Sequence, residues 1–298
     1  MDARPIIDFV VAATAASAGV GVYARRRRAS DGRPAIAARC EFPATALRLP
    51  GVSVGSVVLS EIPGIDGGDI VDVFELDSRF ALLLVADVSG RGTQAAAQTA
   101  FIRYTIRTLA LESEFDPAVV LAKFNAIYFR TVRDDEAFVV LILGIIDSQT
   151  GDLRYASAGH EPAFIRRRNG RLSLLEPTGP IIGAAPFSAY GSDVVRLDPG
   201  DVMVWTTDGM TESRDRRRRL LGTEGLAAWI HAAPGDVNAV ADSLVAALAE
   251  RSGNRKHDDV AVLAVAYGGE APPSCPAVVP ARRAAARPAL MRKPRLLP

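Results

Sequence analysis

The sequence predicts an α+β fold in which two mainly antiparallel β-sheets pack as a sandwich flanked by helices. The expected elements run in the order strands, two helices, many strands, two helices and one strand. This order lacks the regular strand–helix alternation of a doubly wound parallel sheet, so a sandwich fits better. With 298 residues, 49% of them apolar, the chain is long enough to bury a substantial core.

Three strands and two helices are expected in the first half of the domain. The strands are apolar runs bounded by turn residues, and they span residues 54–59, 70–76 and 79–88. Gly90 and Gly92 are expected to break the third strand in a tight turn. Apolar residues then recur at helical spacing over 93–112. A second helix, continuing over 118–130, begins at Asp116-Pro117, where an N-cap residue precedes proline.

Strands dominate the second half of the domain. They are apolar runs at 138–146, 153–157, 163–167, 172–175, 194–197, 202–206 and 260–267. Asn169-Gly170 is a typical hairpin turn between the third and fourth of these strands. Asp198-Pro199-Gly200 is expected to pair the fifth strand with the sixth in a further hairpin. Two helices are expected at 222–232 and 236–251, before the last strand.

Charge is distributed unevenly along the chain, although the net charge is only +1. Residues 1–39 carry seven basic and three acidic residues, and 269–298 carry six and one, whereas 40–268 carry 22 and 30. A nucleic-acid-binding domain usually has a basic face, so the acidic middle argues against nucleic acid as a partner. Only two cysteines are present, which fits a reducing compartment and gives no disulfide framework.

The flanks of the domain (residues 49–268) are expected to serve as an anchor, a linker and a tail. The apolar stretch 6–24 has nearly the ~20 residues of a spanning helix, and four arginines follow it at once. By the positive-inside rule, residues 1–28 form a single-pass cell-membrane anchor with the domain in the cytoplasm. A cleaved export signal, disfavoured because its basic residues would come first, and a soluble helix are the alternatives. Residues 29–48 form a linker, and the Pro-, Ala- and Arg-rich residues 269–298 a disordered tail.

Four short acidic clusters in the domain indicate a metal site. They are Asp66-Gly67-Gly68-Asp69, Asp87-Val88-Ser89-Gly90-Arg91-Gly92, Thr207-Asp208-Gly209-Met210-Thr211-Glu212 and His257-Asp258-Asp259. Three of them adjoin apolar strands, where an unneutralised carboxylate is costly. Mg²⁺ and Mn²⁺ prefer carboxylate and water oxygens, so a metal-dependent site assembled from distant segments is predicted.

The ordered set of motifs resembles the metal-dependent (PPM-type) protein phosphatases, above all their bacterial SpoIIE-like branch. Besides the clusters, the matching motifs are Ala158-Gly159-His160 and Leu197-Asp198-Pro199-Gly200-Asp201. The resemblance covers about residues 50–268. It implies a PPM phosphatase-like sandwich with two Mn²⁺ or Mg²⁺ ions at one end, and hydrolysis of phosphoserine or phosphothreonine in proteins by a metal-bridging water. Two such cations can lower the pKa of a shared water and clamp phosphoryl oxygens.

The resemblance also implies a set of metal ligands. Asp69 and Asp87 match ligands of the core pair, with Asp87 as the bridge, and the backbone carbonyl of Val88 matches the main-chain ligand. Asp208 matches a ligand of the second metal. Asp258 matches its companion near the last strand. Asp69, Asp87 and Asp208 each have a simpler interpretation as a turn or cap residue.

Other residues are expected near the ligands with lesser roles. Glu212 lies where some members hold a weaker third metal, and as an exposed glutamate it has an ordinary alternative. Asp72 and Asp259 are expected to support the ligands, and Asp259 competes with Asp258 for the ligand position. His160 is expected to be structural.

The sequence departs from the family pattern at two positions and carries two runs of arginine. Ala261 stands where a threonine is usual, and Glu161-Pro162 replaces a double proline. The loss of the hydroxyl is expected to loosen the surroundings of the ligands. The arginine runs at 166–168 and 216–219 are expected to be solvated loops. The second run is close enough to the Asp208 motif to contact a phosphoprotein substrate or a membrane.

Three functions compete. The first is a membrane-tethered serine/threonine phosphatase acting on a regulatory phosphoprotein such as an anti-sigma-factor antagonist, a step that rests on family analogy. The second is a pseudophosphatase scaffold in the same signalling role, which the intact acidic set disfavours. The third, a nuclease or other phosphoesterase, is disfavoured by the lack of a basic face. Regulation through the membrane segment, through homodimerisation or by another protein is left open.

Overall fold

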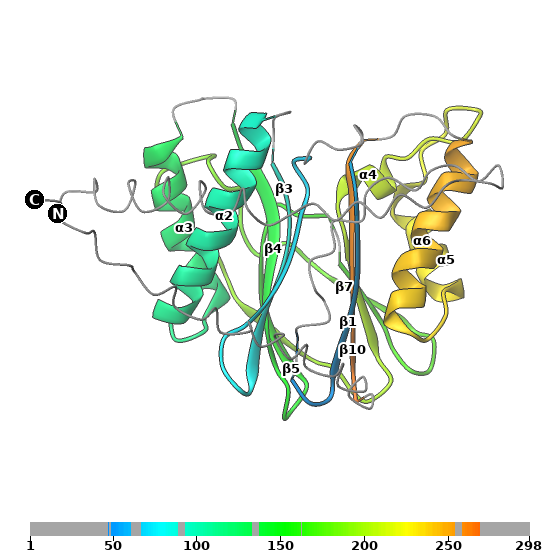
Figure 1. Ribbon diagram of the computed structural model, residues 1–298, viewed down its shortest axis with the longest axis horizontal. Helices are drawn as coiled ribbons and strands as arrows, with labels where there is room; N and C mark the ends of the chain where they lie inside the picture. The colour runs from blue at the N-terminus through cyan, green and yellow to red at the C-terminus, as the bar shows by residue number, and fades with distance from the viewer. Residues whose placement is uncertain are drawn as a thin grey trace, which may run out of the picture.

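The computed structural model describes residues 47, 49–60, 67–88, 93–132, 137–161, 163–253 and 258–268. In these residues two five-stranded sheets pack face to face, and helices cover both outer faces (Figure 1). The predicted α+β sandwich is confirmed. The predicted anchor 1–28, nearly all of the linker 29–48 and the tail 269–298 lie outside the described residues.

The first sheet is antiparallel and has the strand order β1-β10-β9-β6-β7. Its strands are β1 (Val52–Leu59), β10 (Val260–Tyr267), β9 (Val202–Thr206), β6 (Ala163–Arg166) and β7 (Leu172–Leu175). Helices α5 (Gly222–Ala232) and α6 (Val237–Ser252) cover its outer face (Figure 1). Gly55 allows α6 to lie close, because a Cβ there would be 2.4 Å from the Val237 carbonyl oxygen.

The second sheet is also antiparallel and has the order β2-β3-β4-β5-β8. Its strands are β2 (Ile70–Glu75), β3 (Phe80–Val88), β4 (Val139–Asp147), β5 (Asp152–Ala158) and β8 (Asp193–Arg196). Helices α2 (Thr93–Glu112) and α3 (Pro117–Thr131) cover its outer face (Figure 1). As predicted, Asp116 caps the start of α3, and its side chain accepts a hydrogen bond from the Ala118 amide.

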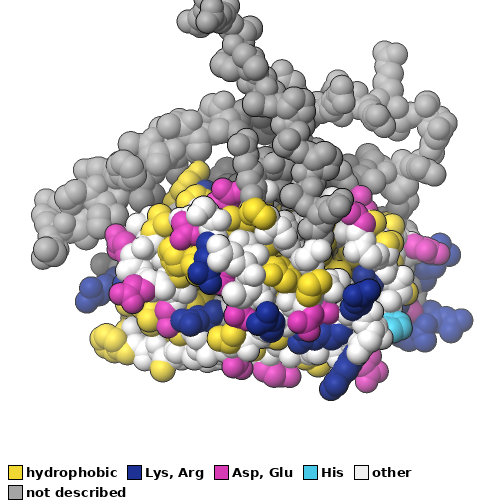
Figure 2. All heavy atoms as spheres, turned by 90° about the horizontal axis from the view of Figure 1, so that it is seen from below, with side chains coloured by type: hydrophobic (Ala, Val, Ile, Leu, Met, Phe, Trp, Pro, Cys, Tyr) yellow, Lys and Arg dark blue, Asp and Glu magenta, His cyan; other side chains and the backbone are white. Residues whose placement is uncertain are grey.

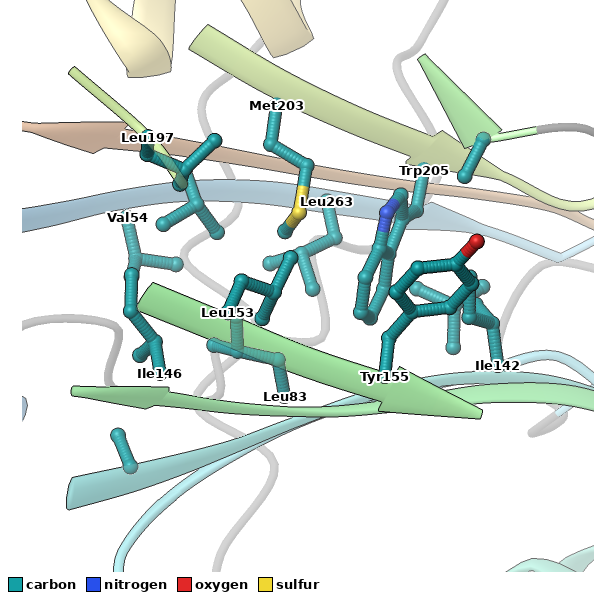
Figure 3. Packing of buried hydrophobic residues seen from close by; sticks show 14 of the residues in the cluster. Val54, Leu83, Ile142, Ile146, Leu153, Tyr155, Leu197, Met203, Trp205 and Leu263 are labelled. Atoms are coloured by element: carbon teal, nitrogen blue, oxygen red, sulfur yellow. The ribbon is translucent and has the colours of Figure 1, made fainter. Parts of the chain in front are cut away.

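Large apolar side chains from both sheets meet in the middle of the sandwich (Figure 3). Trp205 and Met203 of β9 are fully buried against Leu153 and Tyr155 of β5. Gly144 makes room for the indole, since a Cβ there would lie 2.7 Å from the Trp205 ring. A buried aromatic residue of this size contributes much of the apolar area that holds two sheets together. The packing fixes how the ends of the two sheets face each other.

The predicted hairpin between 194–197 and 202–206 is wrong. β8 pairs with β5 in one sheet, and β9 pairs with β10 and β6 in the other. The chain crosses between the sheets at Asp201, a buried carboxylate that accepts hydrogen bonds from the Asp198 and Arg168 amides and from the Arg167 side chain. This network directs the turn away from a tight hairpin.

One short helix was not expected. Helix α4 (Asp208–Thr211) follows β9 directly, and the sequence had suggested only a motif there. Across the described ranges, no helix combines the length and apolar character required to traverse a bilayer.

Candidate metal centre

The topology brings the acidic clusters together at one end of the sandwich. Ile70 at the start of β2 pairs with Ala86 near the end of β3, which places Asp69 beside Asp87. In the facing sheet, β9 leads into α4 at the point where β10 begins, and the Thr207 amide donates to the Ala261 carbonyl. This end lies uppermost in Figure 1, where β3 and α4 are labelled.

Asp69 and Asp87 point towards the space between the sheets. Asp87 lies on the same face of β3 as Val85, which belongs to the core between the sheets. Asp69 is 8% exposed, and its Oδ2 accepts a hydrogen bond of 2.6 Å from the Thr207 hydroxyl. The same hydroxyl oxygen accepts 2.8 Å from the Ala261 amide. Thr207 therefore links the two sheets through a predicted ligand.

The sequence motifs do not predict the role of Thr207, and they draw attention only to the side chain at position 261. The signal available in the sequence was that Thr207 immediately precedes Asp208. At position 261 the backbone amide supplies the hydrogen bond, so it does not depend on the residue type there.

The carboxylates of the cluster act on one another. Burial raises the pKa of Asp69 well above its usual value, and the charges of Asp87, Asp259 and Asp208 raise it further, against the Thr207 hydrogen bond. Burial, followed by the charges of Asp208 and Asp258, raises the pKa of Asp87 to about 6. The pKa of Asp208 is raised by burial and then by Glu212 and Asp258. In each case the neighbouring charges that raise the pKa belong to other carboxylates. This is the pattern expected where like charges share one site.

Asp258 and Asp259 take different positions. The Gly68 amide donates a 2.9 Å hydrogen bond to Asp259 Oδ2, which ties the start of β2 to the start of β10. The charge of Asp258 acts on Asp87 and on Asp208. The charge of Asp259 acts on Asp69 and Asp87 as well, so the choice of Asp258 over Asp259 as the ligand stays a prediction from the motif order.

The glycines beside the cluster are required by close approach. A Cβ on Gly67 would lie 2.1 Å from Asp259 Oδ2, and one on Gly68 would lie 2.6 Å from the Val88 carbonyl oxygen and 3.4 Å from Asp87 Oδ1. On the other sheet, a Cβ on Gly209 would lie 2.0 Å from the Asp259 carbonyl oxygen. The Val88 carbonyl oxygen and the Asp87 carboxylate, both predicted ligands, therefore both lie close to Gly68.

Glu161 and Glu212 lie at the rim of the cluster. Burial raises the pKa of Glu161, and the charges of Asp208 and Glu212 add to the effect. Thr211 of α4 donates a 3.4 Å hydrogen bond to Glu161 Oε2. The sequence marks Glu161 only as a departure from a double proline, because its position after β5 gives no local sign that it contacts α4.

His160 and Asp72 do not add charge to the acidic cluster. His160 is buried, and burial lowers its pKa to about 4, so the ring is neutral and packs as a structural residue. Asp72, expected to support the ligands, lies on the opposite face of β2 and is bound by Arg107 of α2 at 2.6 and 2.7 Å. The alternation of strand side chains explains this, since Asp72 and Asp69 are an odd number of residues apart.

The donor set fits Mg²⁺ or Mn²⁺ chemically. In the residues that the structure describes, no three His, Cys, Asp or Glu side chains converge into a complete metal-binding group. Mg²⁺ usually keeps several waters and takes only one or two carboxylates. The cluster supplies oxygen donors only, and the mutual raising of the pKa values of Asp69, Asp87 and Asp208 marks charge that a cation would neutralise.

Comparisons with known proteins agree with the fold and the motifs. The family model described as Stage II sporulation protein E (SpoIIE) matches residues 77–268. Protein IcfG of Synechocystis is 28% identical over 224 residues, which cover 66% of this chain and 35% of IcfG. Phosphoserine phosphatase RsbU of Bacillus subtilis is 30% identical over 142 residues, covering 47% of this chain and 42% of RsbU. The matches thus span well under half the length of these relatives.

Solved structures share the fold at low sequence identity. The SiaA-PP2C domain of Pseudomonas aeruginosa superimposes with a TM-score of 0.64 at 21% identity, covering 72% of this chain and 85% of that domain. The catalytic domain of the serine/threonine phosphatase PstP, solved with two manganese ions, has a TM-score of 0.51 at 12% identity, covering 74% and 99%. Two antiparallel sheets flanked by helices are the common architecture.

Proposed function

The chain belongs to the SpoIIE family, as its motifs predicted, and on this basis we propose that it is a metal-dependent protein serine/threonine phosphatase. The observation that carries the proposal is the acidic cluster, in which β2, β3, α4 and β10 bring carboxylates to one end of the sandwich. The curated name of RsbU, a phosphoserine phosphatase, supports the same reaction class.

Two Mn²⁺ or Mg²⁺ ions are proposed as cofactors, in line with the two manganese ions of PstP. The residues that would hold them are Asp69, Asp87, the Val88 carbonyl, Asp208 and Asp258. Glu212 lies near enough to Asp208 to raise its pKa, which supports it as a ligand of a weaker third site. When bound, such ions supply a water of lowered pKa and a clamp for the phosphoryl oxygens.

The protein's own residues orient these ligands. Thr207 holds one oxygen of Asp69, and the Gly68 amide holds Asp259 and with it the start of β10. The Gly67-Gly68 and Gly209 backbones leave the approach clear of side chains. Supports of this kind set the orientation of ligands, and their loss typically costs 10–100-fold in metal affinity or activity.

The proposed substrate is phosphoserine or phosphothreonine on a regulatory protein, such as an anti-sigma-factor antagonist. This step rests on family analogy. A cell-membrane tether through residues 6–24, with the catalytic domain cytoplasmic, and pairing of two copies are proposed from the sequence alone. Fractionation of cells expressing the full-length protein tests the tether, which recovery entirely in the soluble fraction would overturn.

The activity is tested with the full-length chain. We expect hydrolysis of p-nitrophenyl phosphate and of a phosphoserine peptide with Mn²⁺, its loss in chelator, and its loss in Asp87→Ala. Lack of Mn²⁺-dependent turnover, with Asp87→Ala indistinguishable from wild type, would overturn the proposal and favour the pseudophosphatase scaffold. Glu112→Ala, at an exposed position at the end of α2, serves as the surface control.

A further inference from the structure

A short arginine-rich hairpin adjoins the acidic cluster. It begins where α4 ends, with the Ser213 amide donating to the Met210 carbonyl, and it closes with the Leu221 amide donating to Ser213. Arg214 and Leu220 form an isolated β-bridge across it. Figure 1 shows this connection between α4 and α5 at the same end of the sandwich as the cluster. We call residues 213–221 the arginine hairpin.

The arginine hairpin is held in one shape by its only acidic residue. Asp215 Oδ1 accepts hydrogen bonds from the Arg217 and Arg219 amides, at 2.8 and 2.9 Å, and Oδ2 pairs with the Arg219 side chain at 2.9 Å. Arg251 of α6 donates to the Arg219 carbonyl at 2.8 Å. These contacts use Asp215 and Arg219 to fix the turn.

Three arginines of the hairpin remain available to a partner. The side chains of Arg216, Arg217 and Arg218 are exposed, and within the described ranges they make no hydrogen bond or ion pair. Arg218 adopts a positive φ of 65°, an uncommon conformation for a side-chain-bearing residue.

The other arginine run of the chain serves the fold. Arg166 donates to the Ile230, Ala233 and Pro234 carbonyls at the end of α5. Arg167 pairs with buried Asp201. The expectation that residues 166–168 form a solvated loop is therefore wrong for two of the three. In the hairpin, by contrast, three consecutive arginine side chains have no partner among the described residues.

The hairpin follows the acidic motif of α4 directly in the chain. Asp208 opens α4, and Glu212 lies between this helix and the hairpin. The hairpin therefore begins beside the proposed metal centre. The opposite end of the sandwich shows basic and acidic side chains interspersed (Figure 2).

We propose that Arg216, Arg217 and Arg218 bind an acidic segment of the phosphoprotein that flanks its phosphorylated residue. The inference rests on the proposed phosphatase function and names the substrate class that this site selects. Arginine suits the role because it binds carboxylates in a planar, bidentate manner. Oppositely charged surfaces also steer encounter, so the preference declines with salt. The position beside the cluster favours a protein segment over an anionic membrane.

The test compares two synthetic phosphoserine peptides with the full-length protein. They have equal length, and the residues flanking phosphoserine are Asp and Glu in one and Asn and Gln in the other. We expect wild type with Mn²⁺ to favour the acidic peptide about tenfold in kcat/KM, equivalent to ~1.4 kcal/mol, mainly through KM. Raising NaCl from 50 to 500 mM should remove most of this preference.

A double variant and a matched control assign the effect to the hairpin. Arg217→Glu with Arg218→Glu should abolish the preference while changing hydrolysis of p-nitrophenyl phosphate by less than about twofold. The control, Arg168→Glu with Arg171→Glu, makes the same charge change at the exposed β6–β7 turn at the opposite end. It should keep the preference. Equal preference in the double variant and wild type, or none in wild type, overturns the proposal.

Binding in chelator separates this inference from the phosphatase function itself. Fluorescence anisotropy of labelled peptides reports the preference without turnover. If p-nitrophenyl phosphate is not hydrolysed but the acidic peptide still binds through the hairpin, the phosphatase proposal fails and the docking proposal stands. If the double variant loses only binding to phosphatidylglycerol-containing vesicles, the hairpin is a membrane contact and the docking proposal falls.

Discussion

The two ends of the sandwich treat buried aspartates in opposite ways. At the end opposite the cluster, Arg79 binds Asp147 and lowers its pKa to about 2. There too Asp201 has a lowered pKa, because hydrogen bonds from Arg167 and two backbone amides outweigh its burial. At the cluster end, Asp69 and Asp87 face other carboxylates and their pKa values are raised.

The difference shows what each end is built to do. Where the fold supplies an arginine, the carboxylate serves stability and its charge is satisfied internally. Where carboxylates from four segments converge and burial is added, the folded protein carries a cost that a bound cation would remove. The comparison therefore separates structural aspartates from proposed ligands by their partners, a distinction that residue type alone does not make.

The largest effect is expected from Asp87→Asn, which tests whether the cluster end binds metal. The substitution keeps the shape and removes the charge, so we expect kcat for p-nitrophenyl phosphate with Mn²⁺ to fall at least about 100-fold. Metal-free protein should be at least as stable as wild type in urea, because a repelled carboxylate is gone. Retained activity together with lost stability would place Asp87 among the structural aspartates.

Asp201→Ala tests the end opposite the cluster, where the aspartate is expected to serve stability. It leaves the Arg167 guanidinium and two amides without their acceptor, so we expect a loss of about 3 kcal/mol in the free energy of unfolding. Activity of the folded fraction should be unchanged. Urea unfolding followed by fluorescence of buried Trp205 measures the loss, and Asp201→Asn, which keeps one acceptor oxygen, should lose less.

The sequence predicted the local parts of this contrast better than the distant ones. The strands at 172–175, 202–206 and 260–267 have the predicted bounds, because their apolar runs and turns are local signals. The partner of 194–197 was predicted wrongly, because pairing β8 with β5 depends on a turn held by distant Arg167. The predicted hairpin was based only on the turn residues between the two strands, Asp198-Pro199-Gly200.

The candidate site shows the same limit. Ordered acidic motifs predicted that Asp69, Asp87 and Asp208 would come together, and they lie within electrostatic reach of one another. Thr207 and Glu161 could not be predicted in this way, because their roles arise from contacts across the sandwich and with α4. The position of Asp72 was predictable, because side chains alternate along a strand and Asp72 lies three residues after Asp69. The two side chains therefore point to opposite faces of the sheet.

Added metal should stabilise the protein through the cluster end alone. At a free Mn²⁺ concentration 100 times its Kd, we expect a gain of about 2.7 kcal/mol in the free energy of unfolding. Asp87→Asn should gain far less, whereas Asp201→Asn should gain as much as wild type. Thermal unfolding with and without Mn²⁺ measures the shift. An equal shift in both variants would mean that the ion binds elsewhere.

The smallest effect is expected from acid titration of Asp147. Its pKa is about 2 when folded and ~3.9 when unfolded, so the ionised form favours the folded state. This contribution is complete above about pH 4 and is lost as the pH falls towards 2. Wild type should therefore lose its advantage over Asp147→Asn between pH 4 and 2, measured by urea unfolding in chelator. The effect is limited because the Arg79 side chain is 42% exposed and solvent screens the pair. A gap between the two proteins that stays constant over this range would show that Asp147 stabilises the turn through neutral hydrogen bonds, and the charge contrast between the two ends would then rest on Asp201.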